Sequence, residues 1–140
     1  MIETKVSGAH MKVFTDFSKY GVKVRDAVSE ELDAIALDVV SGIKKAMRRT
    51  KKQSKTVGKR GHHPSVAGFP PAVDSGHLRD NIEILRTGDT VEVGSNVKYG
   101  AYLQTGTKRG LKARPWLEPG LDSVDITMRM SAAIRRAFKK

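Results

Sequence analysis

Residues 69–117 read FPPAVDSGHLRDNIEILRTGDTVEVGSNVKYGAYLQTGTKRGLKARPWL. This segment contains the only tryptophan of the chain and two of its three tyrosines. Glycines and prolines separate its short apolar runs, a pattern typical of a compact unit rich in turns. We therefore take the segment as the centre of the fold, with a helical region on each side.

The middle of the segment predicts an antiparallel hairpin. Apolar residues alternate with glutamates on both sides of a Thr-Gly-Asp turn at residues 87–89. Two runs of period two around such a turn indicate paired strands with one buried face. That face would carry Ile82, Ile84, Val91 and Val93.

Short helices are expected on both sides of the hairpin. Asp74 or Ser75 can cap a helix that runs through Ile82, because a side-chain oxygen can accept a hydrogen bond from an unpaired backbone N–H. In residues 97–107 the next helix would end at Gly106, a residue that readily adopts a positive φ. Its packing face would carry Tyr99, Tyr102 and Leu103, and the Arg114-Pro115-Trp116 corner would follow.

Residues 22–49 carry the clearest helical pattern. Apolar residues recur every three or four positions and form one stripe: Val24, Val28, Leu32, Ile35, Val39, Ile43 and Met47. Acidic residues lie in the first half and basic residues at the end, which complements the helix dipole. At about 1.5 Å per residue the helix would be about 40 Å long. It is either a core helix throughout or packs in part on a neighbouring subunit.

The two ends of the chain are less strongly patterned. Residues 1–21 are expected to be an N-terminal lead-in, in which Val13, Phe14 and Phe17 could form a short strand. Residues 7–11 also admit the hypothesis that a leader added for expression precedes a native start at Met11. A C-terminal helix is expected from Pro119 or Gly120 to about residue 138. One face of it would carry Leu121, Val124, Met128, Ala132 and Ile134.

Together these elements predict a single α+β domain over residues 1–140, with a small antiparallel sheet packed against the two helices. The chain has no cysteine, which excludes disulfides and thiolate metal sites. Its apolar runs are too short to span a membrane.

The net charge of +11 is concentrated in two regions. Residues 44–73 carry nine basic and no acidic residues, and residues 108–140 carry nine basic and three acidic ones. We expect residues 50–73 to be a mobile basic loop, because like charges repel and few apolar groups offset the cost of ordering. Contacts to DNA or to a protein partner would come from Arg48, Arg49, Lys51, Lys52, Lys55, Lys59 and Arg60.

No set of residues suited to catalysis is recognisable. His62 and His63 are adjacent but lie among cations without a nearby carboxylate, which disfavours a metal site. The Ser-Gly-His sequence at residues 75–77 lacks the glycine spacing of a nucleophile elbow. We therefore expect no enzymatic activity, no bound metal and no cofactor.

Three blocks of the chain resemble a known family. The first combines Pro70-Pro71 with DSGHLRDNI at residues 74–82, the second is VGSNVKYGAYLQTGT at 93–107, and the third is RPWLEPGL at 114–121. Their order and spacing are similar to those of tail-component proteins of long-tailed bacteriophages, with Gln104-Thr105 in place of Glu-Phe, Ser75 in place of Thr and Trp116 in place of Phe. The structural motif comprises Asp74, Ser75, Gly76, Leu78, Tyr99, Tyr102, Gly106, Thr107, Arg114, Pro115 and Trp116.

The resemblance implies a structural virion protein that acts in tail completion or head–tail joining. Such proteins typically assemble as a hexameric ring around the DNA channel and contact the tail tube and the connector. The chain would then be found in the phage neck, and in the host cytoplasm during assembly. The alternative is a non-specific DNA-binding module that uses the basic loop.

Overall fold

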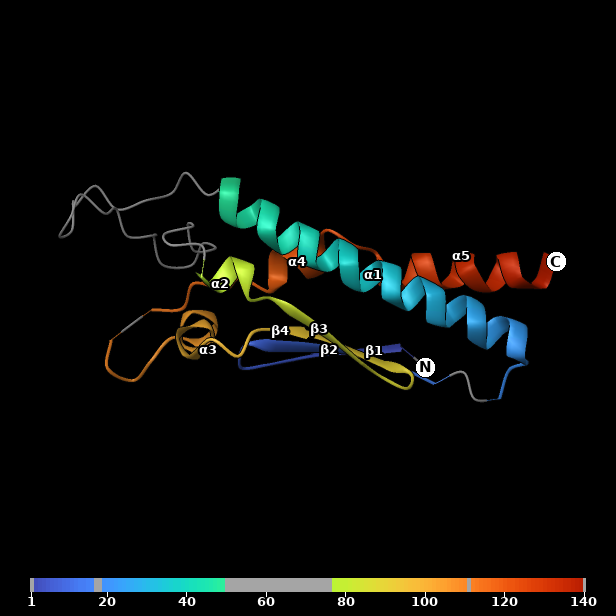
Figure 1. Cartoon of the computed structure of the whole chain (residues 1–140), viewed down its shortest axis with the longest axis horizontal. Coiled ribbons are helices and arrows are strands. Elements are labelled where there is room, and N and C mark those ends of the chain that lie inside the picture. Colours follow the sequence, from blue (N-terminus) through green and yellow to red (C-terminus); the bar gives the residue numbers. More distant parts are fainter. Residues whose placement is uncertain (1, 17–18, 50–76, 111, 140) are drawn as a thin grey trace.

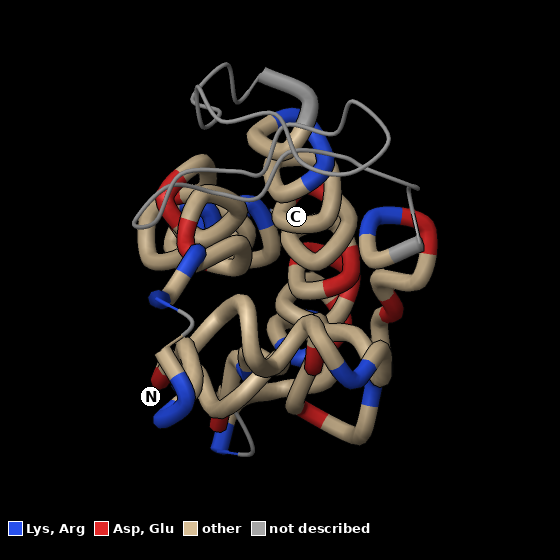
Figure 2. Tube along the Cα trace, turned by 90° about the vertical axis from the view of Figure 1, so that its left-hand side faces the viewer, with Lys and Arg blue, Asp and Glu red and all other residues tan. Residues whose placement is uncertain are grey.

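The structure, a computed structural model, describes residues 2–16, 19–49, 77–110 and 112–139. It has two layers, a four-stranded antiparallel sheet and a layer of helices over one face (Figures 1 and 2). The sheet order is β1-β2-β4-β3. The elements are β1 (Ile2–Ser7), β2 (His10–Thr15), α1 (Val22–Arg49), α2 (His77–Asp80), β3 (Glu83–Thr87), β4 (Thr90–Gly94), α3 (Lys98–Thr105), α4 (Glu118–Asp122) and α5 (Ile126–Lys139). This arrangement confirms the predicted α+β class.

Helix α1 confirms the long helix expected from the apolar stripe. All seven residues of that stripe are at most 5% exposed. They form one core with buried residues of β2 and β4, among them Met11, Val13, Val91 and Val93. The helical period and the alternation of the two central strands therefore place their apolar residues in the same interior.

The hairpin of β3 and β4 is also confirmed, with Gly88 at a φ of 55° in its turn. The prediction of one buried face holds for β4 and for Ile82, which packs against the core, but only in part for β3. Val91 and Val93 of β4 are buried, whereas Ile84 is 38% exposed. The reason is that β3 is an edge strand, so it has a neighbouring strand on only one side.

Arg86 ties the edge strand β3 to α1. Its guanidinium donates hydrogen bonds to the Asp33 carboxylate at 2.5 Å and to the Ser29 hydroxyl at 2.8 Å. A third bond, from Nε, reaches the carbonyl of Gly88 in the turn at 2.7 Å. The arginine thus connects the hairpin turn, its edge strand and the helix layer.

The expected N-terminal lead-in is instead a hairpin of the sheet. β1 and β2 pair over the whole of residues 2–7 and 10–15, and β2 also pairs with β4. The strand expected at Val13 and Phe14 is therefore present, while Phe17 lies outside the described residues. Burial alternates along β2 with period two. In the sequence Met11 and Val13 alternate with Lys12, and this alternation was the signal for a longer strand.

The short helix before the hairpin ends at Asp80 and does not continue through Ile82. The chain must become extended by Glu83, where β3 begins, so the last helical residue lies earlier. The proposed capping residues Asp74 and Ser75 lie outside the described part of the chain.

The predicted single C-terminal helix is two helices, α4 and α5. Asp125 caps the second one, because its Oδ1 accepts a hydrogen bond from the backbone N–H of Met128 at 3.0 Å. Leu121, Val124 and Ile134 of the expected face pack against the core, but the restart shifts the buried face of α5. Met130 and Ala133 are buried, whereas Met128, expected on the packing face, is 63% exposed.

Helix α4 packs closely on α1 through Gly120. A Cβ atom at this glycine would lie 2.5 Å from Cγ1 of Ile43 and 2.6 Å from the backbone oxygen of Val39. The backbone oxygen belongs to the rigid ladder of α1 and cannot move aside as a flexible side chain could. The close crossing of the two helices therefore requires glycine at this position.

We predict that Gly120→Ala lowers the free energy of unfolding by about 2–3 kcal/mol, since overpacked sites force backbone shifts. Urea denaturation followed by circular dichroism measures this value. Gly21→Ala is the control for added volume: no atom lies within 4 Å of its added Cβ, so the loss should stay below about 1 kcal/mol, the cost of alanine at the N-cap of α1. Equal midpoints for the two variants would contradict the packing argument.

Candidate functional site

A buried hydrogen-bonded site joins α3 to the segment that enters α4. Its central residue is Gln104, which is 7% exposed on the last turn of α3. Its Oε1 accepts hydrogen bonds from the backbone N–H groups of Trp116 at 2.9 Å and of Leu117 at 3.2 Å. One side-chain oxygen thus satisfies two buried backbone donors.

The amide nitrogen of Gln104 faces the other way. Its Nε2 donates to both carboxylate oxygens of Glu118, at 2.7 and 2.8 Å. The amide therefore acts as acceptor and donor at once, a combination that neither a carboxylate nor an apolar side chain provides. Glutamine at this position connects the end of α3 to the first turn of α4.

Trp116 completes this junction. It is fully buried, and its indole N–H donates to the carbonyl oxygen of Gly100 at 2.8 Å. Gly100 gives α3 its close approach, because an added Cβ would lie 3.0 Å from Cδ1 of Leu78 and 3.7 Å from the Trp116 ring. We call Gly100, Gln104, Trp116 and Glu118 the α3–α4 junction.

Predicted motif residues lie at and beside this junction, and the expected face of α3 is confirmed only in part, since Leu103 packs against the core. Trp116 and Leu78 are buried, and Gly106 ends α3 at a φ of 77°. Tyr99 and Tyr102, however, are 41% and 55% exposed. The buried face is the one that carries Gly100 and Gln104, since the small glycine allows the closer approach.

The remaining motif residues divide into two groups. Thr107, Arg114 and Pro115 are partly exposed on the segment between α3 and α4. The backbone N–H of Arg114 donates to the Leu103 carbonyl at 2.6 Å, which holds that segment against α3. Gly76, like Asp74 and Ser75, lies outside the described residues.

Gln104 was missed as a packing residue, although its spacing of four from Gly100 was a signal for a shared helix face.

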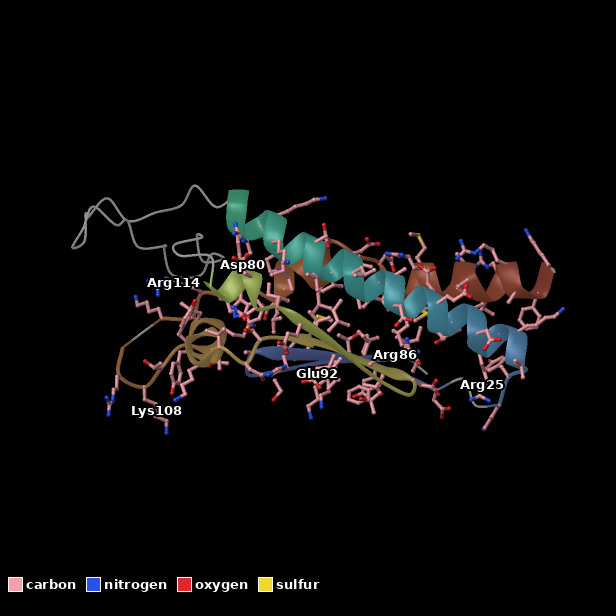
Figure 3. The ribbon with its side chains drawn as sticks, viewed as in Figure 1. Arg25, Asp80, Arg86, Glu92, Lys108 and Arg114 are labelled. Carbon is pink, nitrogen blue, oxygen red and sulfur yellow. The ribbon has the colours of Figure 1, made fainter. Side chains whose placement is uncertain are left out.

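A second feature is the basic end of the molecule. Residues 98–114 contain five basic and no acidic residues. Lys98, Lys108, Arg109 and Lys112 are exposed. Figure 3 shows Lys108 toward one end of the molecule and Arg25 toward the other, and α1 runs toward the end that carries Lys108. We call these four exposed cations the α3-end cations.

The cations of the predicted contact loop are not placed by this structure. Lys51, Lys52, Lys55, Lys59 and Arg60 lie outside the described residues. Arg48 and Arg49 are the last residues of α1, and their side chains are likewise not described. Their contact with DNA or a partner stays a prediction.

A third cluster joins α5 to the acidic half of α1. The Arg129 guanidinium bonds the carboxylates of Glu31, at 2.6 Å, and Asp38, while Arg136 reaches Glu31 at 3.2 Å. Burial lowers the pKa of Arg129, but its hydrogen bonds and charge attraction to Asp38 and Glu31 outweigh this effect and raise the pKa above its ordinary value. These ion pairs therefore link α5 to α1.

We predict that Arg129→Met, which keeps much of the aliphatic stem, lowers the free energy of unfolding by about 1–2 kcal/mol. Glu31, whose side chain is only 15% exposed, would keep a single partner. Urea midpoints at low and high salt test this, and the loss should shrink in high salt. Arg135→Met on the exposed side of α5 is the control, and an equal effect of both variants would refute the ion-pair assignment.

Among the residues that the structure describes, no group of three or more His, Cys, Asp or Glu side chains could hold a metal ion. Within the same ranges, no helix combines the length and hydrophobicity that crossing a membrane requires. The polar side chains at the junction and at the α1–α5 contact bond to the protein itself. Their arrangement fixes the relative positions of the helices.

Comparison with known proteins identifies a family that the chain matches. Over residues 12–106 the chain matches the HK97-gp10-like family model, which describes bacteriophage tail components related to HK97 gp10. No curated protein and no solved structure matches the chain. The matched range covers more than half of the 140 residues and includes α1, α3 and the hairpin of β3 and β4.

Proposed function

The chain belongs to the HK97-gp10-like family of bacteriophage tail components, and from this premise we propose that it completes the tail or joins it to the head. A tail component is a structural protein of the virion. In the proposed role several copies, six in the expected ring, surround the DNA channel at the neck. The partners would be the tail tube and the connector of the head.

The observation that carries the proposal is the family match over residues 12–106, which include α1, the hairpin of β3 and β4, and α3. The structure supports it in one respect. Gln104, Trp116 and Arg129 each use their polar atoms to hold elements of the chain together. A rigid subunit of this kind suits repeated packing against copies and neighbours, since preorganised surfaces pay less ordering cost on binding.

Deleting the gene from the phage that encodes the chain tests the role. We expect full heads and finished tails that do not join, and restored joining when the purified chain is added to the mixture. Electron microscopy and plaque counts measure both effects. Normal infectious particles without the chain would refute the proposal. The chain should also be detected by immunolabelling at the neck, after assembly in the host cytoplasm.

Ring formation has its own measurement. Sedimentation of the chain alone and with tails tests whether copies associate in solution or only on the tail. A ring at the tail end supports the proposal in either case, because subunits can assemble only on their partner. Tails that carry a single copy of the chain would refute the ring while leaving a tail component in place.

A second candidate function is backbone contact with the packaged DNA. The observation in its favour is the α3-end cations, at the end where α1 leads into the basic segment of residues 50–73. Lysine and arginine neutralise phosphates and release counterions, so such binding weakens steeply with salt. It would be independent of base sequence, since phosphate contacts carry no sequence information.

We predict that the quadruple glutamine variant of the α3-end cations lowers the affinity for duplex DNA by about tenfold or more at low salt. The dependence of the affinity on salt should also become shallower, because the variant neutralises fewer phosphates. The matched control replaces four exposed cations at the opposite end of the molecule by glutamine: Lys19, Lys23, Arg25 and Lys139. Fluorescence anisotropy with a labelled duplex measures the affinity of each variant and its dependence on salt. Equal losses of affinity in the two variants would refute the assignment to the α3 end.

A further inference from the structure

The sheet has two open edges. Strands β1 and β3 are its outermost strands, and within the described ranges neither pairs with a strand on its outer side. An edge strand presents a row of backbone donors and acceptors that can pair with another chain. Two such edges on one subunit allow a head-to-tail contact between copies.

One apolar row crosses the whole sheet on the side that faces α1. The register pairs Ile84 with Val93, Val93 with Met11, and Met11 with Val6. The two central residues are 0% and 1% exposed, whereas Ile84 and Val6 at the two edges are each 38% exposed. The row therefore ends half-covered at both edges, because α1 packs over the central strands.

We propose that β3 of one copy pairs with β1 of the next copy, so that Ile84 lies opposite Val6 of the neighbour. This inference rests on the proposed ring and names the contact that builds it. Strand direction alternates across the sheet, so β3 and the next β1 meet antiparallel with the helix layers on the same side. The apolar row then continues from subunit to subunit.

The register set by this row is compatible with the other side chains. It places Leu85 opposite Lys5 and Arg86 opposite Thr4, and no like charges face each other directly. Glu83 is then the diagonal neighbour of Lys5, within reach of a long side chain of opposite charge. A slip by one residue would move the apolar residues to opposite faces, which specifies the register.

The contact uses a different surface on each partner, so it is heterologous. Such contacts produce a ring when the rotation between copies closes. In a closed ring every β1 and every β3 is paired, which removes both open edges. The partner of each edge is thus a second copy of this chain.

Paired cysteines test the contact, because the chain has no cysteine of its own. In the variant Val6→Cys/Ile84→Cys the two thiols of one chain lie three strand spacings apart, about 14 Å, too far for a disulfide. Across the proposed interface they lie opposite each other. After mild oxidation of phage particles that carry the variant, we expect a ladder of cross-linked chains on a non-reducing gel.

The matched control is Val6→Cys/Leu85→Cys. Leu85 is 60% exposed and more accessible than Ile84, but it points to the opposite face of the sheet. Random collisions would therefore cross-link the control at least as well, whereas the proposed register cross-links only the first pair. Particles that contain the first variant without a ladder, or equal ladders in both variants, would overturn the inference and leave the proposed function intact.

A second variant keeps the contact testable if the cysteine variant does not enter phage particles. Val6→Asp places a charge at the proposed interface, so incorporation into particles should fall about tenfold or more. The isolated chain should still fold, with its unfolding midpoint lowered by only a few degrees, since Val6 lies on an edge strand and is partly exposed. Normal incorporation of this variant would overturn the contact. Absence of the wild-type chain from particles would instead refute the proposed function itself.

Discussion

Replacing Trp116 by alanine is expected to lower the free energy of unfolding by about 3–5 kcal/mol, as large-to-small substitutions of buried aromatic residues do. Trp116 is fully buried and is among the largest buried side chains of the described chain. Alanine would leave a cavity between α3 and α4 and would free the carbonyl of Gly100. Urea denaturation measures the loss, which is a large part of the stability of a typical domain.

Trp116→Phe separates volume from hydrogen bonding. Phenylalanine keeps an aromatic ring at this position but has no N–H to offer the Gly100 carbonyl. We expect a loss of about 1–3 kcal/mol, the cost of a smaller ring and an unsatisfied buried acceptor. If the alanine variant were no less stable than the phenylalanine variant, the cavity argument would be wrong.

Replacing Gln104 by glutamate is expected to lower the free energy of unfolding by about 2–4 kcal/mol, since it buries a second carboxylate beside Glu118 and removes two donors. The carboxylate could still accept from the backbone N–H groups of Trp116 and Leu117. The new carboxylate would also lie beside the Glu118 carboxylate, to which the amide nitrogen of Gln104 now donates hydrogen bonds at 2.7 and 2.8 Å. Like charges at this separation repel strongly where little water intervenes.

The double variant Gln104→Glu/Glu118→Gln provides the control. It restores one amide and one carboxylate with their positions exchanged, so the bond across the junction can form again. We expect most of the lost stability to return, and a double-mutant cycle measures the coupling. Additive losses in the double variant would show that residues 104 and 118 do not interact. Gln104 stands where the family pattern has glutamate, so the same test measures what this departure contributes to stability.

Several elements could be predicted because their signals are local. The stripe of α1 repeats with the helical period over 28 residues, so its bounds and its buried face both followed from the sequence. The turn around Gly88 and the helix end at Gly106 followed from the backbone freedom of glycine. The family resemblance rested on such turn and corner residues, and the match over residues 12–106 confirms it.

Errors arose where burial depends on a distant partner. Tyr99 and Tyr102 share a helix face, but the face that packs is the one on which Gly100 allows close approach. Met128 was placed on a packing face by continuing one helix through the break that Asp125 caps. Ile84 has the same alternation as Val93, yet it lies on an edge strand.

The sequence alone thus determined the fold class, the long helix, the central hairpin and the family, because periodicity and turn chemistry act between near neighbours. Only the tertiary structure decided that residues 2–15 complete the sheet and that Gln104 bridges α3 to α4. Gln104 bonds to residues 12 to 14 positions away, and β2 pairs with a strand about 80 residues later. Local spacing can indicate which residues share a face, as in β2 and α3, but it does not indicate which distant surface that face meets when the chain packs.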